Sequence, residues 1–200
     1  MIQLEYQHIP LLQRVSCSQA NQVGGGLRYN VHHKRVLATD EQFHTLVVRV
    51  ENKPGVLARV SGLFARRGFN IQSLAVAPTD NELFSRLTIV VDAESAPMEQ
   101  IVKQLDKLIN VVRIQELSPS DSVSRELILA TVNLTEGSED NIMREIESFD
   151  ANVLSVGDKK IMVSLSGPPD VINEFETVLE KYGIVEVQRT GIVALATIAQ

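Results

Sequence analysis

The feature that most constrains the fold is a spacing of apolar residues that occurs four times along the chain. Apolar residues stand at offsets 0, 1, 4 and 7 of each stretch, and three of the stretches continue to offset 8. This spacing forms the single stripe of an amphipathic helix. The four stretches are Val56–Phe64, Ile101–Ile109, Ile142–Phe149 and Val171–Leu179. Each predicted helix therefore needs an apolar surface on which to bury its stripe.

Segments typical of β-strands flank these helices. They are β-branched or alternate between apolar and polar residues, and turn-forming residues separate them. They lie at 45–50, 70–77, 85–91, 111–117, 126–134, 152–156, 161–165 and 184–188. The resulting order is βαββαβ, twice, with a turn-rich linker at 118–122. This order predicts an α+β fold of two consecutive ferredoxin-like units. The pattern leaves one alternative open, a single α+β domain of six to eight strands.

Length and composition exclude several classes of protein. The chain has 200 residues, 44% hydrophobic and 22% charged, which is ordinary for a globular protein long enough for two small domains. A net charge of −6 argues against nucleic acid as a partner. No apolar run approaches the roughly 20 residues of a membrane span, so we expect no membrane association. The one cysteine, Cys17, cannot form an internal disulfide, which favours a reducing, cytoplasmic location.

The beginning of the chain differs from the rest in charge and pattern. Residues 1–39 contain one acidic and four basic residues and show no sustained hydrophobic period. We therefore expect a flexible extension at 1–42, followed by domains at 43–118 and 119–200. An acid-poor, basic composition is also found in organelle transit peptides, so a plastid or mitochondrial location stays open.

No residue pattern in the chain is typical of a catalytic or metal site. There is no His-x-x-His or Gly-x-Ser-x-Gly pattern, and many carboxylates fall on the polar faces of predicted helices. We expect no catalytic residue, no metal site and no cofactor bound by this chain.

Two polar positions stand out where strands meet the first helix. The turn at 51–57 leads from a strand into a helix N-terminus, whose free N–H groups attract a carboxylate. Gly55 lets a ligand approach the backbone, and the amide of Asn52 can either accept from an ammonium group or cap the helix. Asn70 begins the next strand, where it either faces a site shared with another subunit or simply ends the strand.

The residues around these positions resemble a known family. Asn52–Val60, Leu63–Val76, Ser85–Val91 and Arg125–Leu127 are similar to the ACT domain and following region of acetohydroxyacid synthase small subunits. The resemblance covers about residues 43–195. Gln72 departs from it, because the family commonly has Glu at that position.

The resemblance implies a non-catalytic regulatory subunit in branched-chain amino acid biosynthesis. Such a subunit binds and activates a thiamine-diphosphate-dependent catalytic subunit, which would carry the thiamine diphosphate, Mg and FAD. It also confers feedback inhibition by valine or another branched-chain amino acid. ACT domains of the family form a homodimer and bind the effector at the dimer interface. The matching motif positions imply an effector site at Asn52, Gly55, Asn70 and Ile71.

Two other functions compete with this interpretation. An amino-acid-responsive transcription regulator would need a basic helix-turn-helix, and the basic segment of this chain lacks the apolar period of one. An enzyme with a fused regulatory domain would need a catalytic domain for which the chain has no room.

Overall fold

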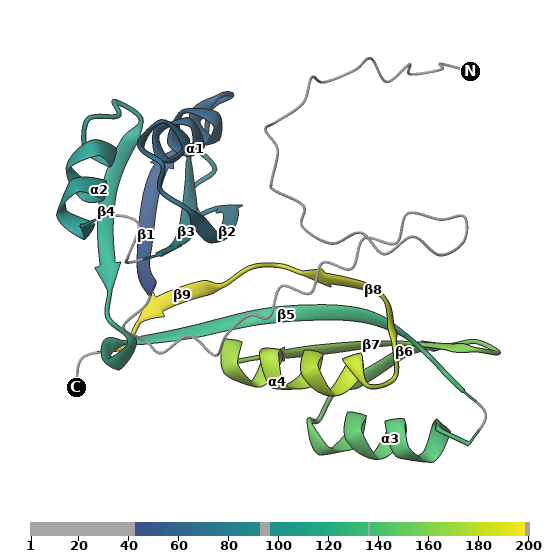
Figure 1. Ribbon diagram of the computed structural model, residues 1–200. Coiled ribbons are helices and arrows are strands. Elements are labelled where there is room, and N and C mark those ends of the chain that lie inside the picture. Colours follow the sequence, from purple (N-terminus) through teal and green to yellow (C-terminus); the bar gives the residue numbers. More distant parts are fainter. Residues whose placement is uncertain (1–42, 93–96, 136, 199–200) are drawn as a thin grey trace, which may run out of the picture. The chain divides into compact units, whose positions relative to one another are not determined.

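The computed structural model of the chain describes residues 43–92, 97–135 and 137–198 (Figure 1). The predicted flexible extension at 1–42 lies outside these residues. The first βαββαβ unit consists of β1 (Phe43–Glu51), α1 (Val56–Arg67), β2 (Ile71–Pro78), β3 (Phe84–Asp92), α2 (Met98–Leu105) and β4 (Val111–Leu117). The second consists of β5 (Ser122–Asn133), α3 (Glu139–Ser148), β6 (Asn152–Val156), β7 (Lys160–Gly167), α4 (Pro169–Glu180) and β8 (Ile184–Arg189).

The strands form separate antiparallel sheets, as the predicted fold class requires. The first has the order β2-β3-β1-β4, and the second has the order β6-β7-β5-β8. The prediction of two ferredoxin-like units is confirmed, and a single continuous sheet is not what the structure has. The division into separate domains at residue 118 stays a prediction.

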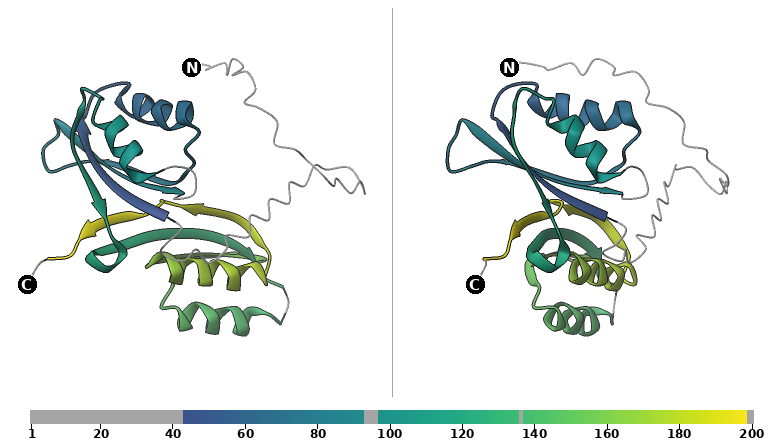
Figure 2. Two further views of the ribbon diagram at one scale, coloured as in Figure 1. Left: turned by 60° about the vertical axis from the view of Figure 1, so that its left-hand side comes forward. Right: turned by 90° about the vertical axis from the view of Figure 1, so that its left-hand side faces the viewer.

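Helices α1 and α2 cover one face of the first sheet (Figure 2). Their apolar stripes pack on the alternate strand residues that face them, because side chains repeat about every 3.6 residues in a helix and every two residues in a strand. The shared core contains Leu46, Val48, Val50, Val56, Val60, Leu63, Phe64, Leu87, Ile89, Val91, Ile101 and Leu105. The opposite face of this sheet carries no helix from its own unit.

The predicted stripe of α2 was too long by one turn. The helix ends at Leu105, and Ile109 lies in the following turn with 91% of its surface exposed. Leu108 still packs against the core because its amide bonds back to the Leu105 carbonyl at 3.0 Å. The turn therefore keeps one of the two apolar residues in place without continuing the helix.

One further strand, β9 (Val193–Ala196), was not predicted. It pairs with the beginning of β5, from Ser122↔Ala196 to Arg125↔Val193. The turn-rich segment that precedes β5 forms a short 3-10 helix, Pro119–Asp121, rather than an open linker. A four-residue strand carries too short a pattern to be told from a loop by its periodicity.

A largely buried ion pair ties the second sheet to α4. Arg189 on β8 makes paired hydrogen bonds to the carboxylate of Glu126 on β5, and these two side chains are only 11% and 3% exposed. The same guanidinium donates to Glu176 at 2.7 Å and to Asn173 at 2.9 Å. Burial lowers the pKa of Arg189, but hydrogen bonds and charge attraction from Glu126 and Glu176 outweigh it, so the net pKa is raised.

Candidate ligand-binding site

The turn between β1 and α1 depends on a glycine. Gly55 is the N-cap of α1 and has φ 81° and ψ −4°, the left-handed conformation that side chains disfavour. A Cβ added at this glycine would meet no atom within 4 Å. The requirement for glycine is therefore one of backbone conformation, and the space around it is open to a ligand.

The N-terminus of α1 has free hydrogen-bond donors. None of the described side chains caps the helix, and its first turn contains no acidic residue. The Val56 amide bonds to the Lys53 carbonyl at 3.3 Å, whereas the amides of Leu57 and Ala58 have no partner among the described residues. Together with the helix dipole, these amides suit a carboxylate.

Asn52 does not cap the helix, so that interpretation of its amide was wrong. Its Nδ2 donates to the Glu82 carbonyl at 2.9 Å, and its backbone N–H donates to the Leu83 carbonyl at 2.8 Å. Both bonds tie the turn to the connection between β2 and β3. Its Oδ1 accepts no hydrogen bond within the described residues and remains available to an ammonium group.

A polar network fixes the flank of this turn. Lys53 Nζ lies 3.0 Å from Glu51 Oε1, and the Asn110 amide donates to the other oxygen of Glu51. Arg59 Nη1 in turn donates to Asn110 Oδ1 at 2.6 Å. The bonds from Asn110 and Lys53 hold the pKa of Glu51 below its ordinary value, although burial acts in the opposite direction. Asn110 carries no sequence signal of this role, because the pairing of β1 with β4 is what brings it close.

Asn70 and Ile71 lie at the other end of α1. The helix has 12 residues and ends at Arg67, and its C-cap Gly68 takes the left-handed conformation with φ 70°. At 1.5 Å per residue, α1 separates the two ends by about 18 Å. Asn70 is exposed, and Ile71 is half-buried against the core of its unit. One chain therefore does not bring the four predicted site residues together.

β2 presents a free edge next to these residues. It is an outer strand of the first sheet and pairs with β3 among the described residues. The side chains of Val76 on β2 and Leu57 on α1 are each 43% exposed, which is high for apolar residues. An unpaired edge with apolar side chains beside it is suited to pairing with another chain.

The described residues contain neither a metal cluster nor a membrane-spanning helix. No group of three or more His, Cys, Asp or Glu side chains among them is placed to hold a metal ion. None of the described helices is long and apolar enough to cross a membrane.

The fold and the glycine turn of the first unit agree with an ACT domain, and the family match identifies it as one. The AHAS small subunit-like ACT domain family matches residues 46–113, and the family described as the small subunit of acetolactate synthase matches residues 125–198. The two matches correspond to the two βαββαβ units.

Complete proteins give the same assignment. The chain is 48% identical over 153 residues to the acetolactate synthase small subunit of Mycolicibacterium smegmatis, covering 76% of this chain and 90% of the relative. It is 49% identical to that of Mycobacterium bovis, covering 76% and 91%. The crystal structure of the small subunit from Thermotoga maritima superposes with a TM-score of 0.73 at 34% identity, covering 80% of this chain and 99% of that one. The chain belongs to the acetolactate synthase small-subunit family.

Proposed function

We propose that the chain is the regulatory subunit of acetolactate synthase, also called acetohydroxyacid synthase. It binds and activates the catalytic subunit and confers feedback inhibition by valine or another branched-chain amino acid. Family membership supports the assignment to this enzyme. The observation that carries the sensing role is the uncapped N-terminus of α1, with its free amides beside the Asn52 side chain.

A zwitterionic amino acid fits the groups at the two ends of α1. The amides of Leu57 and Ala58 would bind its carboxylate, and the side-chain oxygens of Asn52 and Asn70 would accept from its ammonium group. The exposed part of Ile71 would form the apolar wall for a branched side chain. The motif does not select among valine, leucine and isoleucine.

The separation of the two ends requires a second copy of the chain. β2 is parallel to β1, so its C-terminal end lies at the same end of the sheet as the Asn52 turn. Antiparallel pairing of two β2 edges about a two-fold axis would bring Asn70 of one protomer toward the turn of the other. A homodimer through the ACT domains would then hold two equivalent effector sites, each shared between protomers.

The chain would act on catalysis through its partner. Thiamine diphosphate, Mg and FAD are assigned to the catalytic subunit, and this chain contributes no catalytic residue. Effector inhibits only if it binds one conformation of the assembly more tightly than another. A cytoplasmic location stays a prediction from the cysteine usage.

The test combines binding with activity. The full chain is titrated calorimetrically with valine, leucine and isoleucine, with lysine as a control. Acetolactate formation by the catalytic subunit is then measured with added chain and with increasing effector. We expect activation by the chain, and inhibition by the amino acid that gives saturable heat.

Variants locate the effector site. Asn52→Ala and Asn70→Ala should each weaken inhibition about tenfold, the equivalent of one hydrogen bond to a charged group, while activation is kept. Asn152→Ala, an exposed asparagine on β6, is the matched control. Unchanged inhibition in both site variants would place the effector elsewhere, and absence of activation would reject the regulatory role itself.

A further inference from the structure

Three arginines stand side by side on the face of the first sheet that its own helices leave open. Arg49 on β1 is directly opposite Arg86 on β3 and directly opposite Arg113 on β4. Their neighbours Val48 and Val50 belong to the core beneath the helices, so strand alternation directs Arg49 to the other face. Residues directly opposite one another across a sheet share a face, and like charges in that arrangement repel.

No carboxylate neutralises this row within the described part of the chain. Arg86 and Arg113 are exposed, and no ion pair or hydrogen bond forms between either of them and a described residue. Glu51 is the carboxylate two residues along β1 on the same face. It is already engaged by Lys53 and Asn110. No described carboxylate therefore compensates the three positive charges.

The central arginine is held in place and keeps an unsatisfied donor. The guanidinium of Arg49 lies 4.4 Å from the centre of the Phe84 ring, a cation–π contact that orients it. Its Nε is buried and has no hydrogen-bond partner among the residues that the structure describes. Buried donors are almost always satisfied, so this N–H is a donor available to a bound acceptor.

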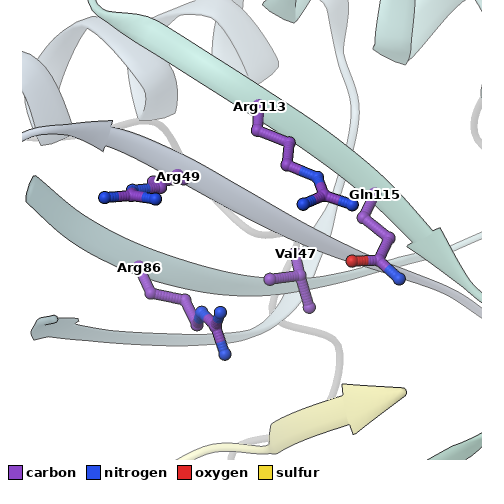
Figure 3. Close-up of a pocket in the computed structure, with 5 residues that line it drawn as sticks. All are labelled: Val47, Arg49, Arg86, Arg113 and Gln115. Atoms are coloured by element: carbon purple, nitrogen blue, oxygen red, sulfur yellow. The ribbon is translucent and has the colours of Figure 1, made fainter. Parts of the chain in front are cut away.

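These side chains line a small pocket. Its lining consists of Val47 and Arg49 on β1, Arg86 on β3, and Arg113 and Gln115 on β4 (Figure 3). Its volume of about 70 Å³ exceeds the roughly 10–15 Å³ that one water molecule needs. The pocket therefore has room for a compact polar group.

We propose that this pocket binds a multiply charged oxyanion of the phosphate class through Arg49, Arg86, Arg113 and Gln115. The planar fork of a guanidinium matches the oxygens of such a group, and several arginines together favour more than one negative charge. The site lies on the opposite face of the sheet from α1 and its N-terminus, so it is distinct from the amino acid site. The proposal holds whether or not the chain senses a branched-chain amino acid.

The test uses inorganic pyrophosphate as the probe and the full-length chain. Calorimetric titration and thermal unfolding are followed at low millimolar pyrophosphate, with sodium chloride at equal ionic strength to remove screening effects. We expect saturable binding and a rise in Tm that sodium chloride does not reproduce. Arg113→Gln and Arg86→Gln should each weaken binding about tenfold, the equivalent of one charge-assisted hydrogen bond.

Two further variants distinguish a specific binding site from nonspecific electrostatic attraction. Arg86→Lys keeps the charge but loses the fork, so it should also weaken binding. Arg144→Gln removes an exposed arginine from α3 and should leave binding unchanged. Without pyrophosphate, Arg113→Gln should have the same Tm as the wild type or a higher one, because repulsion in the row is relieved.

Three outcomes would overturn the proposal. The first is a wild-type response that sodium chloride reproduces in full. The second is equal loss of binding in Arg144→Gln, which would indicate nonspecific attraction. The third is an absence of pyrophosphate binding together with weaker binding of the catalytic subunit by Arg86→Gln, which would assign the row to carboxylates of a protein partner.

Discussion

At the scale of single residues, the N-cap glycine of α1 and the glycine inside that helix differ in backbone conformation. Gly55 has a positive φ and open space around it, whereas Gly62 lies inside the helix. A Cβ at Gly62 would approach only the end of the flexible Arg66 side chain, at 3.4 Å. The same substitution should therefore have opposite effects on stability at the two positions.

We expect Gly55→Ala to lower the free energy of unfolding by about 1–2 kcal/mol, the cost of the left-handed conformation. Gly62→Ala should raise it by about 0.5–1 kcal/mol, because glycine weakens a helix interior relative to alanine. Urea denaturation of the two variants measures both changes. A Gly55→Ala variant as stable as the wild type or more stable would mean that the turn does not require a left-handed residue.

Glu51 should make stability depend on pH on the acidic side. Its folded-state pKa lies below its unfolded value, so its contribution is present above the unfolded pKa and is lost as the pH falls through the folded pKa. Asn110→Ala removes the largest cause of that shift and should raise the pKa of Glu51 more than Lys53→Met does. Side-chain NMR titration of Glu51 measures the three values, and a larger shift in Lys53→Met would contradict the assigned order of causes.

At the scale of elements, the spacing of apolar residues predicts individual helices and strands, and their order predicts the fold class. The stripe Val56–Phe64 places α1 correctly because each of its contacts recurs within a turn or two of the helix. The stripe at 101–109 overestimates α2, because Leu108 can reach the core from a turn as well as from a helix. Strand β9 and the arginine row depend on pairing between distant segments, which a pattern within one segment does not contain.

The Arg189 cluster joins two strands to a helix, and its loss should be costly. Arg189→Met leaves Glu126 buried without its partner, so we expect a loss of about 3–5 kcal/mol in the free energy of unfolding. The raised pKa of Arg189 keeps it charged across the working pH range, so its own titration adds no pH dependence there.

The control for this change is an ion pair on the surface. Lys103 and Glu99 of α2 lie 3.2 Å apart and are 71% and 84% exposed, so Lys103→Met should cost no more than about 0.5 kcal/mol. Chemical denaturation at neutral pH compares the two variants. Similar losses in both would show that burial does not decide the strength of the Arg189 pair.

At the scale of the whole molecule, a single chain does not bring the predicted effector-site residues together. Sequence similarity selects Asn52, Gly55, Asn70 and Ile71 as a set, yet α1 holds the two halves of that set about 18 Å apart. The sequence therefore predicts which residues take part, but it does not predict that they belong to different protomers. The proposal of a site shared between protomers rests on the length of one helix and on the position of β2 at the edge of its sheet.

A mixed dimer tests this arrangement directly. In a dimer of one Asn52→Ala chain and one Asn70→Ala chain, one shared site carries both substitutions and the other carries neither. Each variant alone should bind the effector about tenfold more weakly, so mixing the two should restore wild-type affinity at one site per mixed dimer, measured by calorimetry after subunit exchange.

If each site lay within a single chain, every site in the mixture would carry one substitution and sensitivity would not return. Two differently tagged wild-type chains provide the control for exchange, since their purified mixed dimer should bind at two sites. Restored binding in the mixed variant dimer would place the turn of one protomer against β2 of the other. The regulatory response would then require the dimer, because neither chain alone contains a complete site.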